Sequence, residues 1–391
     1  MNSGKILITG AGGCIGQNFM KSVAGRPLVV ASSRPGLKDK ENTTYFHADF
    51  SDKKTHEADF WSEHIEKNNV GVIVNLAGGA YAPFGGSLQD INLHPVAAMA
   101  TASKNTGAHL VQISSMAALK VFPTDETDYS KTKYEAEERV RETTDDYTIV
   151  RPDLVFADHS TVSMRHAFSP NEVVTLPGPT VVLGKGYQTL QPVGLGDTVQ
   201  GLKAIAENPG KAKGESINFL GPDIISQIGL FSMLKEARGE SFFPAKIEFD
   251  SCAAKSIKKL ATLEPFGSFN PSLMGALENG DKRESVAGYD NRRFIELLDG
   301  KELTSLSSVL DQSQLKFIKP PVAELAGRVL KNPEAIVAAG TFVASVMPSM
   351  VGAIARGSKQ YMNNGTEKKR PLDIILQQKK KGTSEEQSRG R

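Results

Sequence analysis

The sequence predicts an α/β protein built on a doubly wound parallel sheet, and three observations support this class. Short apolar runs alternate with longer segments of helical spacing through the first half of the chain. The runs are rich in β-branched residues and continuously apolar, as expected of parallel strands that are covered on both faces. A glycine-rich turn follows the first run and leads into a helical pattern. Strand-helix alternation of this kind favours a sheet with helices on both faces.

The order of these elements can be followed along the chain. Strands are predicted at Ile6–Ile8, Leu28–Ala31, Val70–Leu76, His109–Ile113 and Tyr147–Val150. Helices are predicted at Gly16–Val23, Val96–Asn105 and Lys131–Thr143. After residue 153 prolines and glycines interrupt the alternation, although two further helices are expected at Asp197–Glu207 and Gln227–Arg238.

Composition and charge restrict the class of protein. The chain has 391 residues, of which 39% are hydrophobic and 23% charged, which is a globular composition. A net charge of +2 gives no electrostatic reason to expect a nucleic-acid partner. Two cysteines, Cys14 and Cys252, predict no disulfide framework and fit a reducing compartment. No cleavable apolar segment precedes the first strand, so we expect a cytoplasmic protein.

A glycine motif at the end of the first predicted strand is the strongest functional signal. It reads Thr-Gly-Ala-Gly-Gly-Cys-Ile-Gly over residues 9–16. Gly10 permits the tight turn, Gly13 lets a pyrophosphate approach the backbone, and Gly16 lets helix and strand pack closely. The following helix begins with free N–H groups that favour an anion. This arrangement predicts a Rossmann-type dinucleotide site, with contacts from Gly10, Gly12, Gly13, Cys14, Ile15 and Gly16.

The end of the second strand indicates which dinucleotide is preferred. An NAD site usually has an acidic residue about 20 residues after the glycines, whereas this chain has Ser32, Ser33 and Arg34. Ser33 and Arg34 can hydrogen-bond and neutralise a 2′-phosphate. We therefore expect NADP(H) to be preferred, with NAD also possible. The alternative is that Arg34 is only a solvated loop cation.

Further cofactor contacts are expected where later strands end. Asp49, followed by Phe50, could accept a hydrogen bond from the adenine amino group. Small residues in the segment Leu76-Ala77-Gly78 would let the cofactor approach the backbone. Pro152 would shape the floor beside the nicotinamide, unless it merely ends its strand.

The candidate catalytic residues are Ser115, Tyr129 and Lys133. Ser115 follows the strand that begins at His109, and Tyr129 and Lys133 are four residues apart, so they share one face of the predicted helix. A neighbouring ammonium and the positive ring of an oxidised cofactor should lower the tyrosine pKa and favour proton exchange. Ser115 would hydrogen-bond the substrate oxygen, and Lys133 would also hold the nicotinamide ribose.

No metal site is predicted from the sequence. The seven histidines include no pair four residues apart, and the two cysteines are distant from each other.

The motifs together resemble the extended or atypical short-chain dehydrogenase/reductase superfamily, in its epimerase/dehydratase-like branch. The resemblance covers roughly residues 4–230 and rests on motifs that occur in the family's order. They are Thr-Gly-x-x-Gly-x-x-Gly, Asn75-Leu76-Ala77-Gly78, Asn92, Ser114-Ser115, Tyr129-x-x-x-Lys133 and Arg151-Pro152. The resemblance implies the cofactor and catalytic roles given above.

Two later segments are similar to a narrower group, the NADPH-binding accessory subunits of respiratory complex I and their bacterial relatives. These segments are Leu190–Asp197 and Gly214–Pro222. The resemblance implies tight NADPH binding, which in several members has no demonstrated turnover. The Tyr129/Lys133 pair, often degraded in that group, is intact here. The segment after about residue 240 matches neither group.

The chain is expected to have four parts. Residues 1–230 form the NAD(P)-binding Rossmann domain, residues 231–330 a smaller substrate lobe, residues 331–362 an alanine-rich helical segment, and residues 363–391 a basic, disordered tail. Residues 356–391 carry ten basic and four acidic residues. No charged residue occurs from Ala335 to Ala355, a length that could span a bilayer, but alanine, glycine and serine make it only weakly hydrophobic.

Two functions of different classes remain open from the sequence. The first is an NADP(H)-dependent oxidoreductase, or an epimerase/dehydratase-like enzyme, that acts on a carbonyl or hydroxyl group of a small-molecule substrate through Ser115, Tyr129 and Lys133. The second is a non-catalytic NADPH-binding structural or redox-sensing module of a larger complex. Residues 335–391 would then meet a protein or membrane-surface partner. The sequence gives no oligomeric state.

Overall fold

The structure is a computed structural model, and it describes residues 4–79, 87–119, 128–156, 180–183, 189–237, 244–247 and 290–311. The elements named below are those of this part of the chain. The predicted alanine-rich segment and basic tail, residues 331–391, lie outside the described residues, as does Cys252.

A seven-stranded parallel sheet forms the centre of the fold, which confirms the predicted class. Its strand order is β11-β6-β5-β4-β1-β2-β3, and every pairing within it is parallel. The strands are β1 (Lys5–Thr9), β2 (Leu28–Ser32), β3 (Thr43–His47), β4 (Val70–Asn75), β5 (His109–Ile113), β6 (Tyr147–Pro152) and β11 (Glu215–Phe219). Strand order reverses between β1 and β4, and open α/β sheets bind their ligands at such a switch point, at the carboxyl ends of the strands.

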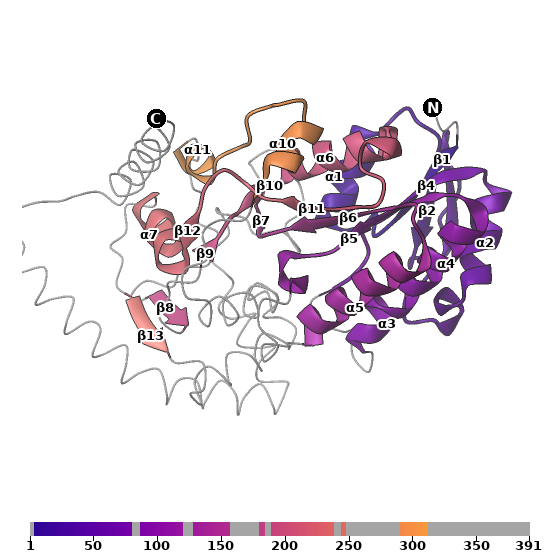
Figure 1. Ribbon diagram of the computed structural model, residues 1–391, viewed down its shortest axis with the longest axis horizontal. Helices are drawn as coiled ribbons and strands as arrows, with labels where there is room; N and C mark the ends of the chain where they lie inside the picture. The colour runs from indigo at the N-terminus through magenta and orange to yellow at the C-terminus, as the bar shows by residue number, and fades with distance from the viewer. Residues whose placement is uncertain are drawn as a thin grey trace, which may run out of the picture.

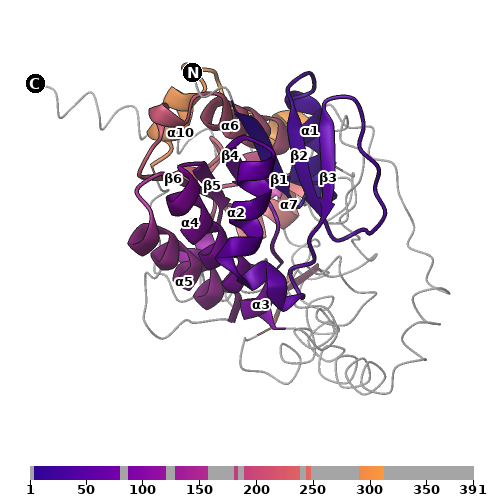
Figure 2. The ribbon, with the colours of Figure 1, turned by 90° about the vertical axis from the view of Figure 1, so that its right-hand side faces the viewer.

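Helices cover both faces of this sheet (Figures 1 and 2). One face carries α1 (Cys14–Ser22), α6 (Leu195–Glu207) and α10 (Arg292–Leu297). The other face carries α2 (Ala58–Lys67), α4 (His94–Thr106) and α5 (Asp128–Thr143). Strand side chains alternate between the two cores: Ile6 and Ile8 face α1, and Leu7 faces α2 and α4. Helices shield both faces of the sheet from solvent, which explains why the strands are continuously apolar.

Short elements connect the main layers. They include η1 (Lys53–His56), α3 (Leu88–Asn92), η2 (Met116–Ala118) and η3 (Pro209–Lys211). Three two-stranded pairings lie outside the main sheet: β7 (Val155–Phe156) with β10 (Val193–Gly194), β9 (Thr189–Leu190) with β12 (Ile225–Ser226), and β8 (Thr180–Leu183) with β13 (Pro244–Ile247). A smaller apolar cluster joins α7 (Gln227–Ala237) to α11 (Leu306–Asp311).

The predicted elements agree with the structure in most places. The predicted strands correspond to β1, β2, β4, β5 and β6, and the predicted helices to α1, α4, α5, α6 and α7. Additional elements of the central domain include the helices α2 and α3 and the two edge strands, β3 and β11. Within the described ranges, no helix combines the length and apolar character needed to cross a bilayer.

The domain boundaries stay a prediction, but one contact bears on them. Phe294 and Leu297 of α10, from residues assigned to the second lobe, are buried in the first domain's core. The Phe294 ring stacks on Phe219 of β11 with a centroid separation of 4.1 Å. Residues late in the chain therefore return to complete the face beside α6.

The close approach of α1 to β1 depends on Gly16, and a Gly16→Ala substitution tests it. A Cβ at Gly16 would lie 2.2 Å from the carbonyl oxygen of Gly10, a backbone atom that cannot rotate away. We expect Gly16→Ala to lower the free energy of unfolding by about 3 kcal/mol, as overpacking does. Chemical denaturation of the purified variant measures the loss.

Gly12→Ala is the matched control, because a Cβ at Gly12 would meet nothing within 4 Å. We expect its unfolding free energy to stay within about 0.5 kcal/mol of wild type. Equal stability of the two variants would contradict the packing argument.

Candidate functional site

The glycine turn at the carboxyl end of β1 divides into a packed inner part and an open outer part. Gly10 has a φ of +64°, and a Cβ there would lie 2.5 Å from the backbone nitrogen of Ala77. Gly16 packs equally closely on Gly10. In contrast, a Cβ at Gly12 would meet nothing within 4 Å, and one at Gly13 would meet only the Gly10 carbonyl, at 3.3 Å. The outer part is thus where a ligand could approach the backbone.

The first turn of α1 has no side-chain cap. Gly13 is its N-cap residue and donates its own N–H to the Gly10 carbonyl at 3.0 Å. The amides of the first helical turn, which begins with Cys14 and Ile15, therefore offer the partial positive charge that favours a bound anion. Cys14 itself is buried, and burial raises the pKa of its thiol, so it stays neutral.

A buried chain of polar side chains fixes the ends of three neighbouring strands. The Thr9 hydroxyl donates to Oδ1 of Asn75, whose Nδ2 donates to Oε1 of Gln112 at 2.7 Å. The Gln112 amide donates in turn to the Ile113 carbonyl at 2.6 Å. The backbone N–H of Ala77 contacts both Thr9 Oγ1 and Asn75 Oδ1, at 3.3 and 3.2 Å. The segment leaving β4 is therefore held against β1.

The same segment reaches α5 at Gly78. Gly78 has a φ of +148°, and a Cβ there would lie 2.9 Å from both Asn92 Oδ1 and Lys133 Nζ. Asn92 is buried and holds both backbone groups of Gly79: its Nδ2 donates to the carbonyl at 2.8 Å, and its Oδ1 accepts from the N–H at 3.0 Å. The predicted cofactor loop and Lys133 thus meet, with Asn92 of α3 fixing the loop in place.

Ser115 and Tyr129 complete this cluster. Ser115 is the N-cap residue of η2, and its side-chain oxygen accepts a hydrogen bond from the Ala117 N–H at 3.2 Å. The side chains of Ser115 and Tyr129 are hydrogen-bonded to each other. Tyr129 lies in the first turn of α5, one turn before Lys133. The structure therefore brings the three predicted catalytic residues to one place.

The ionisation of these groups differs from the sequence expectation. Burial raises the pKa of Tyr129, and the hydrogen bond from Ser115 opposes this only in part. Burial lowers the pKa of Lys133 to about 8, with the charge of Glu137 acting in the opposite direction. In the protein alone, Tyr129 is therefore a neutral phenol at pH 7. The expected lowering of its pKa by the ammonium is outweighed by loss of solvent.

Glu137 is a part of the site that the sequence reasoning missed. It follows Tyr129 and Lys133 at the same four-residue spacing on α5 and is 1% exposed. Its carboxylate accepts hydrogen bonds from Arg151 Nε at 2.9 Å and from Arg151 Nη2 at 2.5 Å. Arg141 Nη2 donates to it at 2.6 Å. The continued spacing and the arginine before Pro152 were signals in the sequence for this pairing.

The charge of Glu137 is stabilised by these arginines. Burial alone would raise the pKa of its carboxyl, but the hydrogen bonds and charge of Arg151, with a further hydrogen bond from Arg141, outweigh burial, so the pKa lies below its ordinary value. Lys133 thus has a fixed anion one helical turn away, and the end of β6 is anchored to α5.

The predicted adenosine contacts lie at the ends of β2 and β3. Ser33 and Arg34 are exposed directly after β2, and the Arg34 N–H donates to Ser32 Oγ at 3.1 Å. Asp49 Oδ1 accepts from both the N–H and the hydroxyl of Ser51, at 2.9 and 2.7 Å. Phe50 packs edge-on against Trp61 with a centroid distance of 6.0 Å. These residues share the edge of the sheet with the glycine turn.

The two later segments that were singled out in the sequence contact each other beside β6. Gln191 Nε2 donates to the Gly221 carbonyl at 3.0 Å, and a Cβ at Gly221 would lie 1.8 Å from the Pro192 carbonyl oxygen. Pro152, in the last position of β6, pairs with Phe219 of β11. Asp197 is buried and accepts from the Thr304 N–H at 2.7 Å. These contacts give the segments a structural role.

Comparison with known families gives a match over the first part of the chain. Residues 4–169 match the model of the RmlD substrate binding domain family. Among curated proteins, the chain is similar to NADH dehydrogenase [ubiquinone] 1 alpha subcomplex subunit 9, mitochondrial, of Dictyostelium discoideum, with 27% identity over 167 residues. That match covers 42% of this chain and 44% of the relative, so it spans less than half the relative's length.

Solved structures share the fold at low sequence identity. A nucleoside-diphosphate-sugar epimerase from Staphylococcus aureus is 17% identical with a TM-score of 0.56. The alignment covers 79% of this chain and 100% of the epimerase chain. The UDP-glucuronic acid 4-epimerase of Bacillus cereus, in complex with UDP-glucuronic acid and NAD, is 18% identical with a TM-score of 0.55. This second alignment covers 78% of this chain and 96% of the Bacillus cereus chain. The chain therefore has an epimerase/dehydratase-like fold.

A Glu137→Gln substitution tests the buried ion pair. It leaves Arg151, which is 12% exposed, without its anion, so we expect a loss of about 3 kcal/mol in unfolding free energy at pH 7. Because the folded-state pKa of Glu137 is lowered, the stabilisation is present above its unfolded pKa of about 4.3 and is lost as the pH falls through the folded value. Denaturation curves at several pH values should show the two proteins converging in acid.

Glu142→Gln is the matched control on the same helix. Glu142 pairs with Arg139, and both side chains are 62% exposed, so we expect a change within about 0.5 kcal/mol. If Glu137→Gln is as mild as this control, the buried pair does not anchor β6 to α5.

Proposed function

We propose that the chain is a member of the extended short-chain dehydrogenase/reductase superfamily, that it binds a nicotinamide dinucleotide, and that it acts on a carbonyl or hydroxyl substrate. The dinucleotide would lie across the carboxyl ends of β1, β2 and β4, with NADP(H) preferred over NAD(H). Ser115, Tyr129 and Lys133 would form the reactive end of this site. The reaction would be that of an oxidoreductase or of an epimerase/dehydratase-like enzyme.

The residues present fit such a cofactor. Gly10 and Gly16 have no room for a side chain because backbone atoms occupy it, whereas Gly12 and Gly13 leave the outer part of the turn open. The uncapped N-terminus of α1 adds amide donors suited to a pyrophosphate. Contacts from Cys14 and Ile15 would come from the backbone, since the Cys14 side chain is buried.

The loop that leaves β4 connects the glycine turn to Lys133, and this connection supports the proposal. Lys133 Nζ lies where a side chain of Gly78 would be, in the loop that leaves β4, and Gly10 packs against Ala77 in the same loop. A ligand that follows the edge from the first turn along Leu76, Ala77 and Gly78 would therefore end at Lys133, beside Tyr129. That continuity supports a function in which the dinucleotide and the acid–base residues act together.

The roles of the three side chains follow from their surroundings. Tyr129 is held as a neutral phenol, so its O–H can donate a proton to a substrate carbonyl oxygen during reduction. The Ser115 hydroxyl, which lies beside Tyr129, can turn to donate its proton to the same substrate oxygen. Lys133 is suited to hydrogen-bond a ribose hydroxyl and to favour the phenolate left after proton transfer. When bound, a nicotinamide supplies or accepts the hydride.

The adenosine end would be held by exposed residues. Ser33 and Arg34 provide a hydroxyl and a guanidinium at the end of β2, a pairing suited to a 2′-phosphate. Asp49 and Phe50, after β3, would flank the adenine, and Pro152 would lie on the nicotinamide side. The substrate would be a small molecule, and the UDP-sugars named with the structural neighbours supply a first set to assay.

A second function has a specific observation in its favour. The curated relative is named as a subunit of an NADH dehydrogenase, so the chain could bind NADPH as a structural or redox-sensing module without turnover. Residues 335–391, outside the described residues, would then meet a protein or membrane-surface partner. In this case the dinucleotide contributes only binding free energy to the fold.

A Tyr129→Phe substitution distinguishes these functions. If the protein is an enzyme, removing the phenolic proton should lower kcat by at least about 100-fold while cofactor affinity changes less than about threefold. Cofactor binding can be followed by fluorescence of Trp61, the chain's one tryptophan, which packs against Phe50. Turnover is measured by absorbance of the reduced nicotinamide, with carbonyl compounds and nucleotide sugars as substrates.

Tyr147→Phe serves as the control, because Tyr147 is the first residue of β6 and lies at the amino ends of the strands, away from the proposed site at their carboxyl ends. It should leave turnover and affinity unchanged. Tight NADPH binding with no turnover on any substrate by the wild type would favour the module, and no binding of any dinucleotide would refute both functions.

The proposed preference for NADP(H) is tested by Arg34→Ala. Loss of a charge-assisted hydrogen bond to a 2′-phosphate should weaken NADPH binding by about 10-fold or more and leave NADH binding within about twofold. Lys38→Ala, which removes an exposed cation from the same loop, is the control. Equal weakening of both dinucleotides by Arg34→Ala would contradict the assignment.

A further inference from the structure

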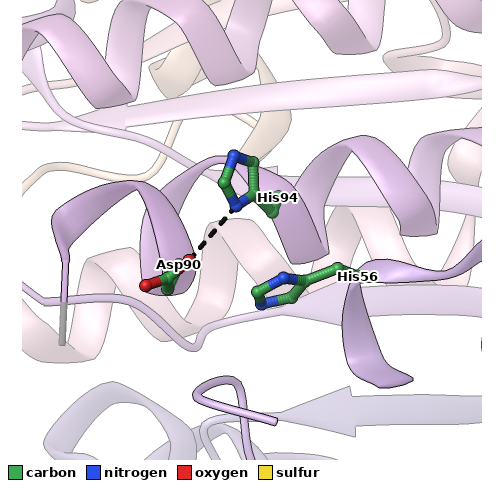
Figure 3. Close-up of side chains that lie close together, drawn as sticks. All are labelled: His56, Asp90 and His94. Carbon is green, nitrogen blue, oxygen red and sulfur yellow. Dashed lines mark hydrogen bonds and ion pairs between the residues drawn. The ribbon is translucent and has the colours of Figure 1, made fainter. Parts of the chain in front are cut away.

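A cluster of two histidines and one aspartate lies outside the proposed dinucleotide site. His56 is the last residue of η1, Asp90 lies in α3, and His94 begins α4. One potential ligand atom from each side chain lies within 4.8 Å of the others. Figure 3 shows the Asp90 and His94 side chains together, with His56 reaching toward them from the other side. We propose that His56, Asp90 and His94 bind a divalent transition-metal ion, with Zn²⁺ the best fit.

The neighbouring hydrogen bonds leave one ligand atom available on His56 and one on Asp90. His56 Nε2 lies 2.9 Å from the Phe50 carbonyl, which can only accept, so Nε2 carries the proton and Nδ1 keeps its lone pair. Asp90 Oδ2 accepts from the Ser87 hydroxyl at 2.8 Å and from the Ser87 N–H at 3.3 Å. Oδ1 of Asp90 is therefore the oxygen that faces His94. Outer partners of this kind orient the ligands of metal sites.

The distance between two of the ligand atoms already suits a bound ion. His94 Nδ1 and Asp90 Oδ1 are 3.3 Å apart. Two ligand atoms about 2.0–2.1 Å from a tetrahedral ion are separated by about 3.3 Å, so the spacing of this pair already suits an ion. On binding, the ion would replace the proton by which His94 Nδ1 now hydrogen-bonds the Asp90 carboxylate. His56 would complete three protein ligands by a small side-chain rotation, with water in the remaining position.

The donor set selects the kind of ion. Two imidazole nitrogens and one carboxylate oxygen suit Zn²⁺ and Co²⁺, whereas Mg²⁺ and Ca²⁺ prefer oxygen ligands throughout. The side chains of His94 and Asp90 are 45% and 37% exposed, which provides a path for entry.

An ion at this site would join two segments at the carboxyl edge of the sheet. His56 follows Asp49 and Phe50 through η1, while Asp90 and His94 flank Asn92, the residue that holds Gly79. The ion would cross-link these segments and stabilise the folded protein by linkage. Histidine spacing gave no sign of this site, because the residue four before His94 is an aspartate and His56 comes from a distant segment.

Zinc titration of the full chain tests the proposal. After removal of metal with a chelator, isothermal titration with Zn²⁺ should show one saturable site per chain. His56→Ala and His94→Ala should each weaken binding by about 100-fold or more, and Ser87→Ala by about 10-fold, since loss of an outer partner costs less than loss of a ligand. Co²⁺ in the same site should give visible absorption bands that disappear in both histidine variants.

The control is His47→Gln, because His47 is exposed at the end of β3 and outside the cluster. It should bind Zn²⁺ as wild type does, and Zn²⁺ should raise the Tm of wild type and His47→Gln but not of the two alanine variants. Circular dichroism confirms that each variant is folded. No saturable binding by the wild type, or binding that both histidine variants retain, would overturn the proposal, whether or not a dinucleotide binds.

Discussion

The close approach of backbone to backbone at the carboxyl edge of the sheet is the constraint on which the rest of this structure depends. Gly10 contacts the segment that leaves β4, and Gly16 contacts Gly10. Each contact occupies the space of a Cβ atom, so only glycine fits. The chain of Thr9, Asn75 and Gln112 then ties the three strand ends together. A rigid edge of this kind can hold functional side chains to a precise geometry.

Helix α5 packs beneath that edge and supports it through a row of polar side chains. Tyr129, Lys133, Glu137 and Arg141 repeat at four-residue spacing, so one face of α5 changes from phenol to amine to carboxylate to guanidinium along the helix. The Glu137–Arg151 contact joins this face to the end of β6. Buried charges are expensive unless paired, and here the pairing places a fixed anion one turn from Lys133. The same ion pair therefore holds α5 against β6 and sets the charge near Lys133.

Elements buried on both faces were predictable from the sequence, and elements at the edges were not. β1, β4 and β5 lie inside the sheet, so their apolar runs are continuous. β11 is an edge strand in which only Ile217 and Phe219 are buried and the other side chains are partly exposed, so its sequence shows no such run. α2 buries Trp61 and Ile65 at a spacing of four, a signal that was present but short. α10 packs only because the chain returns to α6 from far away, which no local pattern encodes.

The candidate site divides in the same way. Residue types and order were enough to predict Ser115, Tyr129 and Lys133 as neighbours, because strand ends and helix faces are local features. Glu137 was not predicted, since a glutamate on a helix is exposed by default and the packing of β6 beside α5 is needed to bring Arg151 against it. The direction of the Tyr129 pKa shift also needed the fold. An ammonium nearby lowers it, but the loss of water around the phenol is the larger effect.

The placement of Lys133 bears on the choice between an enzyme and a binding module. Burial that lowers its pKa to about 8 opposes folding by about 3 kcal/mol, because the unfolded chain keeps a lysine near its ordinary value. A ligand that hydrogen-bonds the ammonium would recover part of this cost, and both functions offer one. Tyr129 is different, since its buried hydroxyl contacts Ser115 and no binding role requires its proton to move. The lysine thus supports dinucleotide binding in either function, and the mobility of the tyrosine proton alone separates catalysis from binding.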